Sequence, residues 1–439
     1  MEKRIQRYFY ALLATVLVQS LAAQLPDDAD HFQAQFGVNM SGGEFSGSFG
    51  IYPDNPVDWD YYAGKGLKLI RLPIKWERLQ TEPGGELVRK DLEKVKQVVE
   101  LAHGRGMKIM LDVHNYGRGH FSSVGKSLII GESEQLTREH FADFWRKMAT
   151  EFKEYRIWGY DLMNEPHDMG RYDWLTTAQT AIDAIREIDA DTHIIIEGNN
   201  WASADTWQQS SDMLKGLVDP ANKIVYQAHC YFDADGSGTY KKGYAEEVGN
   251  DTNRAIRRLS HFVEWLHAND KRGMIGELGC PGDDERWLEM LDGACRYLKE
   301  NNVSLTYWSG GRHWGNYALG IHPPKETMST TPVDKSQMKV LEKYGDGYGE
   351  APTGIEAESV PLAGAEVSIH PNPVRDALYI RSDSPLDELV IYSLNGEAMM
   401  QKKITANSYV ALDFLPAGSY VVRLLPVDGL PIIRKLIKR

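Results

Sequence analysis

Short apolar runs alternate with longer amphipathic segments through the first three quarters of the chain. Each apolar run is predicted to be a strand, because turn-forming residues bound it on both sides. The segments between the runs repeat their apolar residues at helical spacing and are predicted to be helices, among them residues 91–103, 137–155, 173–188, 252–268 and 285–300. The predicted strands are residues 36–40, 68–72, 108–113, 159–163, 193–197, 224–228, 274–276 and 304–308.

Eight strands, each followed by a helix, favour a (β/α)8 TIM barrel over an open doubly wound sheet. The dinucleotide-binding form of the open sheet carries a G-x-G-x-x-G turn after a strand, and no predicted strand is followed by one here. We therefore predict an α/β domain, a (β/α)8 barrel, over residues 24–349.

The pattern changes after residue 350. Residues 350–364 are polar and without periodicity, which predicts a linker. Short alternating runs then occur at residues 366–369, 377–380, 388–392 and 419–424, separated by turn formers. This spacing predicts a small all-β, Ig-like sandwich over residues 365–439. All eleven Trp of the chain lie at or before Trp314, so the composition changes near the same boundary.

The first 23 residues have the features of a secretory signal peptide. Lys3, Arg4 and Arg7 precede a continuous apolar run over residues 8–18, and small residues follow it. The run is too short to cross a bilayer as a helix but suits a signal peptide. No other stretch approaches ~18 uninterrupted apolar residues, so no membrane span is expected.

Composition and net charge limit the class of protein and the kinds of molecule it can bind. Hydrophobic residues make up 42% and charged residues 25%, which excludes low-complexity disorder and collagen. The net charge of −13 disfavours a broad surface for nucleic acid or anionic membrane. Eleven Trp and 22 Tyr supply flat faces that suit sugars as well as cores. Cys230, Cys280 and Cys295 match no zinc spacing and are expected to be buried free thiols, although one disulfide is not excluded.

Functional side chains stand where the predicted strands end. In a barrel of this type the chemistry lies at the C-terminal ends of the strands. Glu165 and Glu277 come from different strands, and acid-assisted cleavage of a glycosidic bond requires such a pair of carboxylates. His229 and Tyr231 are two residues apart and so point to the same face of their strand. The strand-end residues are Arg71, Asp112, His114, Asn115, Asn164, Glu165, His229, Tyr231, Glu277 and Trp308.

These residues, in this order, resemble glycoside hydrolase family 5, the cellulase family of retaining barrel enzymes. That family has Arg after strand 2, His after strand 3, Asn-Glu-Pro after strand 4, His-x-Tyr after strand 6, Glu after strand 7 and Trp after strand 8. The segments RLPIKWERLQ, DVHNYGR, MNEPHD, YFDADGSGT and WSGGRHWGNYALGI also resemble its endo-β-1,4-glucanase branch, and the resemblance covers roughly residues 34–325. The matching positions are Arg71, His114, Asn164, Glu165, His229, Tyr231, Glu277 and Trp308.

The resemblance implies a role for each site residue. Glu165 is expected to be the general acid/base and Glu277 the nucleophile of a double displacement. Arg71 and Tyr231 are expected to donate hydrogen bonds to Glu277. His114, Asn115 and Asn164 are expected to bind sugar hydroxyls, and Trp308 and Trp314 to stack on sugar rings. His229 is the remaining supporting residue of the family set.

The implied function is hydrolysis of internal β-1,4-glucosidic bonds in cellulose-type and mixed-linkage β-glucans. A β-mannanase or a xyloglucanase of the same fold is an alternative, and a non-catalytic surface glycan-binding protein is a less favoured one.

A metal-dependent amidohydrolase would need His-x-His on the first strand, which is missing. Asp233 opens a loop similar to a calcium loop, but Tyr244 replaces the Glu at its twelfth position. No metal or cofactor is expected.

The predicted sandwich resembles the C-terminal sorting domain of type IX secretion, found in certain Gram-negative bacteria. The resemblance rests on IHPNPVRDALYI, LPAGSYVVRLL and the basic end at residues 434–439. It implies export through the inner membrane, then passage across the outer membrane by the type IX machinery, with a secreted or cell-surface product. A carbohydrate-binding sandwich is the alternative, and the lack of Trp in residues 365–439 disfavours it. The expected partners are β-glucan and the secretion machinery, with no nucleic acid, and the chain is expected to be a monomer.

Overall fold

The chain divides into two compact units, Met1–Asp346 and Gly347–Arg439. The computed structural model describes residues 32–46, 50–170, 173–328, 330–346, 367–370, 374–382, 385–393, 398–427 and 432–439. The predicted signal peptide, residues 1–23, and the predicted linker, residues 350–364, lie outside the described residues. Each unit has its own buried apolar core.

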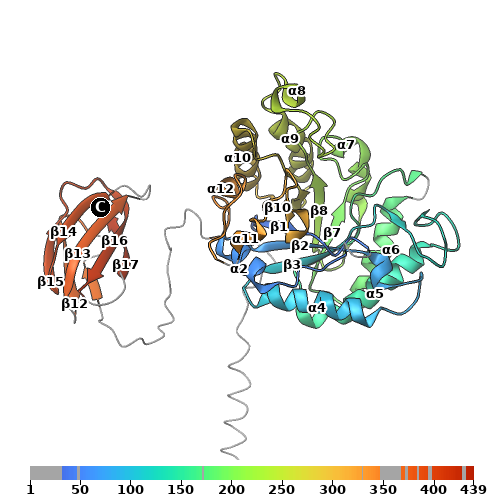
Figure 1. Ribbon diagram of the computed structural model, residues 1–439, viewed down its shortest axis with the longest axis horizontal. Helices are drawn as coiled ribbons and strands as arrows, with labels where there is room; N and C mark the ends of the chain where they lie inside the picture. Colours follow the sequence, from blue (N-terminus) through green and yellow to red (C-terminus); the bar gives the residue numbers. More distant parts are fainter. Residues whose placement is uncertain are drawn as a thin grey trace, which may run out of the picture. The chain divides into compact units, whose positions relative to one another are not determined.

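The first unit is built on eight parallel strands that close into a barrel (Figure 1). The strands follow one another around the ring in chain order, and the first pairs with both the second and the last. The predicted (β/α)8 barrel is therefore confirmed. Its strands are β1 (Phe36–Met40), β2 (Leu69–Ile74), β3 (Lys108–Val113), β6 (Gly159–Asp161), β7 (His193–Glu197), β8 (Ile224–His229), β9 (Gly273–Glu277) and β10 (Ser304–Gly310).

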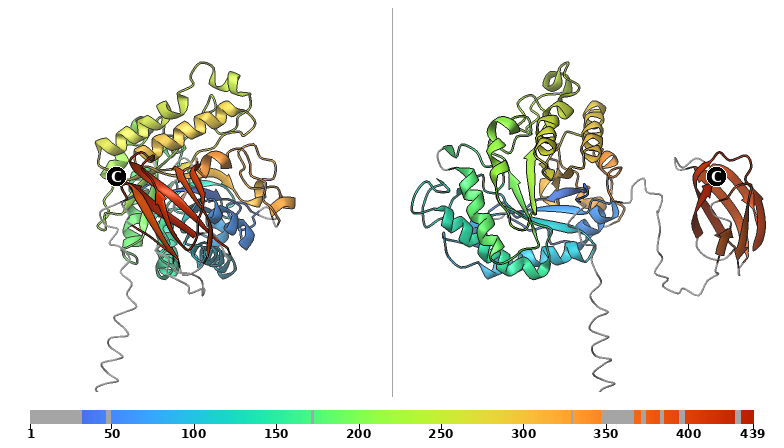
Figure 2. Two further views of the ribbon diagram at one scale, coloured as in Figure 1. Left: turned by 90° about the vertical axis from the view of Figure 1, so that its left-hand side faces the viewer. Right: turned by 180° about the vertical axis from the view of Figure 1, so that it is seen from behind.

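Helices form the outer layer of the barrel, as two further views also show (Figure 2). In α5 (Arg138–Phe152), the Thr137 hydroxyl accepts a hydrogen bond from the backbone N–H of His140 and so caps the helix. Its buried residues recur at helical spacing, which turns one face toward the strands. The other helices are α2 (Pro56–Gly64), α3 (Trp76–Leu79), α4 (Arg89–His103), α6 (Trp174–Arg186), α7 (Trp207–Ser210), α8 (Tyr244–Val248), α9 (Arg254–Ala268), α10 (Glu285–Glu300), α11 (Lys325–Met328) and α12 (Met338–Leu341).

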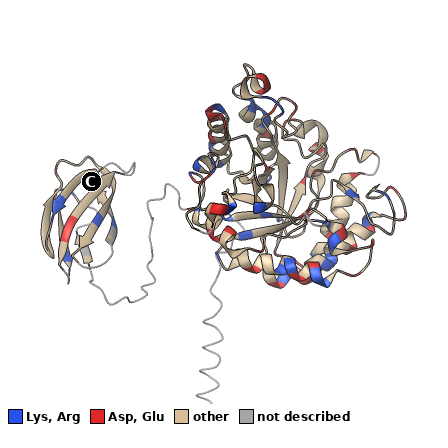
Figure 3. Ribbon diagram, viewed as in Figure 1, with Lys and Arg blue, Asp and Glu red and all other residues tan. Residues whose placement is uncertain are grey.

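The solvent side of this layer carries both signs of charge, interspersed along α4 and α5 (Figure 3). Such a surface is typical of a hydrated helix face rather than of a binding site for a polyanion. Among the described residues, no helix combines the length and the hydropathy needed to cross a membrane. A two-stranded ribbon, β4 (Arg118–Gly119) and β5 (Leu128–Ile129), is inserted after β3.

The barrel interior changes from apolar to polar along the strands. Side chains two residues apart on a strand point to the same side. Near the N-terminal ends, one cluster of buried residues is apolar: Leu69, Met110, Ile195, Val225 and Met274. Two positions further along four of these strands, the buried residues are polar: Arg71, Asp112, Glu197 and Gln227. The strand period therefore builds a polar layer directly beneath the strand ends.

The three cysteines are all buried and free, as the sequence analysis expects. Burial raises the pKa of the Cys230 thiol to about 12, which keeps the thiol protonated near neutral pH.

The second unit is a sandwich of a three-stranded and a four-stranded antiparallel sheet. This confirms the predicted all-β domain. Its core holds apolar side chains from both sheets, among them Leu378, Val410, Leu389 and Val422. In the three-stranded sheet the order is β11 (Val367–His370), β12 (Ala377–Ser382), β15 (Asn407–Ala411). In the four-stranded sheet the order is β14 (Ala398–Lys403), β13 (Leu386–Ser393), β16 (Gly418–Pro426), β17 (Ile432–Lys438).

Because each unit has its own core, we expect a chain that ends at residue 349 to fold without the sandwich. Tryptophan fluorescence reports on the barrel alone, since all eleven Trp precede residue 315. The urea midpoint of this signal should agree between the full and the shortened chain within about 0.3 M. A clearly lower midpoint in the shortened chain would show that the barrel depends on the sandwich.

Candidate active site

Arg71 lies at the centre of the polar layer and is fully buried. Its guanidinium donates to Glu277 Oε1 (3.0 Å), Glu197 Oε1 (2.7 Å) and Asp161 Oδ2 (2.7 Å). The Asp112 Oδ2 atom lies 3.0 Å from its Nη2 atom, so four carboxyl groups surround one cation. Two amide oxygens, Asn39 Oδ1 and Asn164 Oδ1, accept from the same guanidinium at 3.0 and 2.9 Å.

Glu277, at the end of β9, is held by two donors. Arg71 donates to its Oε1 atom, and the Tyr231 hydroxyl donates to its Oε2 atom at 2.7 Å. Burial, with Glu277 beside it, raises the pKa of Tyr231 well above 10, so this hydroxyl keeps its proton. The arrangement stabilises negative charge on Glu277, because both of its oxygens accept hydrogen bonds and one of the donors is a cation.

Glu165, in the loop after β6, faces Glu277 across His229. Its Oε1 atom lies 2.7 Å from His229 Nδ1, and that nitrogen lies 3.6 Å from Glu277 Oε2. One oxygen from each carboxylate and one His229 nitrogen all lie within 4.8 Å of one another. The side chain of Glu165 is 17% exposed and that of Glu277 is 6% exposed. The two carboxylates thus lie close together in different surroundings.

The surroundings of the two site histidines shift their pKa values in opposite directions. Burial lowers the pKa of His114 to about 4, so this ring is neutral near pH 7. Its Nδ1 atom lies 2.7 Å from Asp112 Oδ2, and the tautomer with the proton on Nδ1 donates to this oxygen and leaves Nε2 as an acceptor. Burial alone would lower the pKa of His229, but Glu197, Glu277 and Glu165 around it raise the pKa well above 6.5.

Asn164 has a free donor in the site. Its Oδ1 atom accepts from Arg71, while its buried Nδ2 atom has no hydrogen-bond partner among the described residues. A buried polar group of this kind needs a partner, and a substrate hydroxyl would supply one. The orientation of the amide follows from the Arg71 bond, because only the oxygen can accept.

Asn115 is not brought to the carboxylate pair. Its Oδ1 atom accepts from the backbone N–H of Trp76 at 3.0 Å, and its Nδ2 atom donates to the Glu77 carboxylate at 2.9 Å. A further bond runs to the Arg118 carbonyl. The side chain therefore holds the loop after β3 in place, and both of its amide N–H groups are engaged, which leaves only the Oδ1 atom to accept a bond from a sugar hydroxyl.

Trp308 and Trp314 pack together beside the site with Tyr231 and Leu319. Trp308 also lies parallel to His114, with ring centres 5.6 Å apart and an angle of 14°. Trp314 meets Trp308 edge-on at 5.5 Å and stacks on Tyr317 at 4.7 Å. Both predicted tryptophans therefore belong to an aromatic wall next to Glu277.

Three further aromatic residues continue this wall and were missed in the sequence. Tyr116 contacts His114 edge-on at 5.4 Å, and His167 lies 6.3 Å beyond Tyr116. Trp201 stacks on His167 at 4.2 Å and 11° and is 45% exposed. We call the series Trp308, His114, Tyr116, His167 and Trp201 the aromatic row. Tyr116 and His167 follow strand ends at which candidates were sought, whereas Trp201 follows β7, where none was sought; a position just after a strand end is the signal that could have found all three.

Trp201 also borders a cavity of about 610 Å³ that Glu165, His229 and Tyr231 help to line. The backbone of Asn200, Trp201 and Ala202 is left-handed throughout, with φ between 51° and 56°. This unusual turn holds the Trp201 ring at the mouth of the cavity, next to Glu165. The cavity is large enough for sugar units on the Glu165 side of the site.

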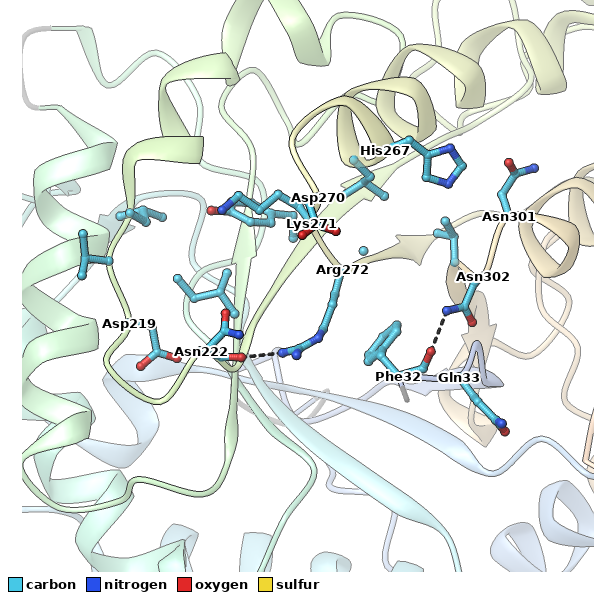
Figure 4. A pocket seen from close by; sticks show the side chains of 17 residues that line it. Phe32, Gln33, Asp219, Asn222, His267, Asp270, Lys271, Arg272, Asn301 and Asn302 are labelled. Atoms are coloured by element: carbon cyan, nitrogen blue, oxygen red, sulfur yellow. Dashed lines mark hydrogen bonds between the residues drawn. The ribbon is translucent and has the colours of Figure 1, made fainter. Parts of the chain in front are cut away.

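A cavity of about 850 Å³ lies elsewhere, where β8 and β9 begin (Figure 4). Its wall includes Phe32, Asn222, Arg272 and Asn302, and Asn302 Nδ2 donates to the Phe32 carbonyl at 2.6 Å. None of the strand-end candidates lines it. We place the candidate site at the C-terminal ends of the strands, because the carboxylate pair and the buried donors meet there.

Within the described ranges, two groups of side chains have the spacing of a metal site: Glu165, His229 and Glu277 of the carboxylate pair, and a second group of three buried carboxylates. Oxygens of Asp112, Asp161 and Glu197 lie within 4.8 Å of one another. The Arg71 guanidinium already bonds to Asp161 and Glu197 and lies 3.0 Å from Asp112, so it takes the place that a cation would occupy. In the loop after β8, both carboxylate oxygens of Asp233 accept hydrogen bonds from backbone N–H groups, those of Gly238 and Thr239. The loop therefore presents hydrogen-bond donors to Asp233, whereas a calcium loop presents oxygen ligands to a cation.

Comparison with known proteins identifies the family. Residues 29–313 match the cellulase family, glycosyl hydrolase family 5. The chain belongs to glycosyl hydrolase family 5. The "Probable endo-beta-1,4-glucanase B" of Neosartorya fischeri is 33% identical over 322 residues, which cover 70% of this chain and 91% of the relative. The predicted cellulase-type hydrolase is confirmed at this level.

Solved structures agree with this assignment. The endoglucanase Cel5A of Pseudomonas stutzeri, in complex with cellobiose, is 37% identical, with a TM-score of 0.63 over 71% of this chain and 92% of that one. The endo-beta-1,4-glucanase Xac0029 of Xanthomonas axonopodis pv. citri is 32% identical, with a TM-score of 0.63 over 71% and 98%. Residues 368–439 match a secretion system C-terminal sorting domain, which confirms the prediction for the sandwich of this family 5 chain.

Replacing Arg71 by Met should destabilise the barrel by about 3–5 kcal/mol, because buried carboxylates lose their cation. Urea unfolding followed by tryptophan fluorescence measures this loss. Arg312→Met is the control, since Arg312 also pairs with a buried carboxylate, Asp58, but is itself 41% exposed. Equal and small losses in both variants would show that the central guanidinium does not hold the layer together.

Proposed function

We propose that this chain is a secreted endo-β-1,4-glucanase that hydrolyses β-glucan with retention of anomeric configuration. The observation that carries the proposal is the pair Glu165 and Glu277, with oxygens within 4.8 Å, beside the aromatic row. Retaining enzymes have carboxyl groups about 5–5.5 Å apart, whereas inverting enzymes need about 6.5–9.5 Å to admit a water molecule. The spacing here supports double displacement.

In the first step, Glu277 attacks the anomeric carbon. A bond forms between that carbon and a Glu277 oxygen while the bond to the leaving oxygen breaks, and Glu165 gives its proton to that oxygen. Arg71 and Tyr231 suit Glu277 for this role, because their hydrogen bonds keep its carboxylate anionic and oriented. The greater exposure of Glu165 suits a group that exchanges its proton with water.

In the second step, water replaces the enzyme at the anomeric carbon. Glu165, now anionic, takes a proton from the water as its oxygen attacks, and the bond to Glu277 breaks. The product has the original configuration, and both carboxyl groups return to their starting states. No other reactant is needed.

Contacts in the site support a glucan substrate. The free amide of Asn164 is suited to bond the sugar 2-hydroxyl, and the Nε2 acceptor of His114 a neighbouring hydroxyl. The aromatic row runs from Trp308, which packs with Tyr231, to Trp201, which lines the same cavity as Glu165, and such flat faces suit a row of sugar rings. The curated and structural relatives named above are endoglucanases, one of them bound to cellobiose. Mannan and xyloglucan are the alternative substrates.

The sorting domain supports a secreted or cell-surface location. We propose that residues 1–23 direct export through the inner membrane and that the type IX machinery carries the chain across the outer membrane. The enzyme is proposed to act as a monomer on β-glucan.

Glu277→Ala should abolish turnover, and azide should restore part of it with formation of the inverted glycosyl azide. Glu165→Ala should lose about 10²–10⁴-fold on polysaccharide, yet cleave aryl cellobiosides with good leaving groups, which need little protonation. Product release and the configuration of the azide adduct are followed by chromatography and NMR. Exchanged phenotypes would mean exchanged roles, and unchanged rates would place the chemistry elsewhere.

Equal amounts of enzyme should release most sugar from barley β-glucan and carboxymethylcellulose in a panel that includes xyloglucan, glucomannan and xylan. Trp201→Ala should raise KM for long cello-oligosaccharides about 5- to 10-fold, as expected for the loss of about 1 kcal/mol of ring stacking. Phe414→Ala removes an aromatic ring of similar exposure from the sandwich and should leave KM unchanged. Higher activity on glucomannan than on β-glucan would replace the substrate assignment.

A further inference from the structure

Glu197 ends β7 and is fully buried in the polar layer, outside the set of residues that touch substrate in the proposed mechanism. Its Oε1 atom accepts from Arg71 Nη2 at 2.7 Å and from Gln227 Nε2. Its backbone carbonyl accepts from the Trp174 indole at 2.8 Å, which fixes the end of the strand. The carboxylate is therefore held from two sides and cannot turn freely.

The other oxygen of Glu197 reaches the backbone of the proposed acid/base. Glu197 Oε2 accepts from the N–H of Glu165 at 2.7 Å. Glu165 has a left-handed backbone, with φ at 45°, which costs energy for a residue with a side chain. The bond from Glu197 offsets this cost, because it satisfies an N–H group that the left-handed turn directs into the barrel.

The same carboxylate lies next to the side chain that orients Glu165. His229 Nε2 is 3.4 Å from Glu197 Oε1, while His229 Nδ1 is 2.7 Å from Glu165 Oε1. His229 thus lies between the two carboxylates: its Nδ1 atom is at hydrogen-bond distance from Glu165, while its Nε2 atom is at ion-pair distance from Glu197 and has no hydrogen-bond partner among the described residues. A ring protonated on both nitrogens donates to Glu165 Oε1 and leaves Oε2 of that carboxyl to carry the proton that is transferred.

The charges that face His229 come from every element packed around it. Glu165 follows β6, Glu197 ends β7 and Glu277 ends β9. Arg71 on β2 and Asp112 on β3 lie behind them. Burial would raise the pKa of Glu197, but His229 and Arg71 lower it to about 2, so Glu197 is an anion.

We propose that Glu197 is a positioning residue for Glu165: it holds the Glu165 backbone and, as the buried counter-ion, keeps His229 an imidazolium that orients the Glu165 carboxyl group. The inference rests on the proposed roles of Glu165 and Glu277. In this proposal Glu197 acts through its negative charge, so a neutral residue of the same shape cannot replace it.

Glu197→Gln removes the charge and keeps the size. A counter-ion within about 4 Å changes the pKa of its partner by about 1–3 units, so the pKa of His229 should fall in this variant. Because His229 must be protonated to act, the alkaline limb of kcat/KM should move to lower pH by at least about one unit. Cleavage of phenyl β-cellobioside, a poor leaving group, should fall about 10²-fold, and that of the 2,4-dinitrophenyl compound less than about tenfold.

Asp161→Asn is the matched control within the same layer. Burial raises the pKa of Asp161 well above its usual value, and among the described residues no hydrogen bond or ion pair joins Asp161 to His229 or Glu165. The oxygen of the new amide can still accept from Arg71 and Gln227, as Asp161 Oδ2 does at 2.7 and 2.9 Å. The alkaline limb should stay in place in this variant, whatever its rate. An unmoved limb in Glu197→Gln, with equal losses on both cellobiosides, would reduce Glu197 to a packing role and overturn the proposal.

The unaltered full chain supplies a test that does not depend on the Glu197→Gln variant. With ¹⁵N-labelled histidine, and with His229 assigned through His229→Asn, both ring nitrogens of His229 should carry protons at pH 7. A singly protonated ring would overturn the proposal even if Glu197→Gln did not fold. Failure of the proposed function gives a different result from failure of this inference. In that case the hydrolysis rate of Glu165→Ala would not depend on the leaving group, while both ring nitrogens of His229 would still carry protons.

Discussion

Burying one guanidinium in the middle of the barrel is the constraint on which the site depends. A charge can leave water only if other charges and hydrogen bonds replace its hydration. Arg71 meets this condition with four carboxyl groups and two amide oxygens. Burial raises the pKa of Asp112 and Asp161, whereas Glu197 stays anionic, so the layer avoids an excess of negative charge. The orientation of Glu277 follows from this balance, since it is one of the four partners.

Much of the site could be predicted because the barrel converts strand position into spatial position. These residues come from four strands, and closing the ring brings them together: Arg71 lies within β2, Asn164 follows β6, His229 and Tyr231 end and follow β8, and Glu277 ends β9. Asn115 shows the limit of this reasoning. It directly follows His114, but neighbouring residues at a strand end point in different directions, and the amide turns to Glu77 instead.

Other parts depend on contacts that no local pattern contains. Glu197 is the last residue of a predicted strand, and only the closed barrel brings its carboxylate to Glu165 and His229. Trp201 reaches the cavity through three successive left-handed residues, a conformation that Asn favours but Trp and Ala do not. In the sandwich, β14 and β15 went unpredicted because most of their side chains are exposed. β17 was taken for a basic tail, yet it pairs along β16.

The division of the site between strands and loops has a consequence for how such an enzyme can change. Arg71, Glu197 and Glu277 belong to strands that are locked by the hydrogen bonds of the barrel, whereas Tyr116, His167 and Trp201 lie in the loops that follow strands. Exchanging the loop after β3 or β7 replaces a ring of the aromatic row and leaves the buried charges where they are, whereas the loop after β6 carries His167 together with Glu165. On the proposed roles, sugar selection can therefore change at two of these loops without rebuilding the reaction.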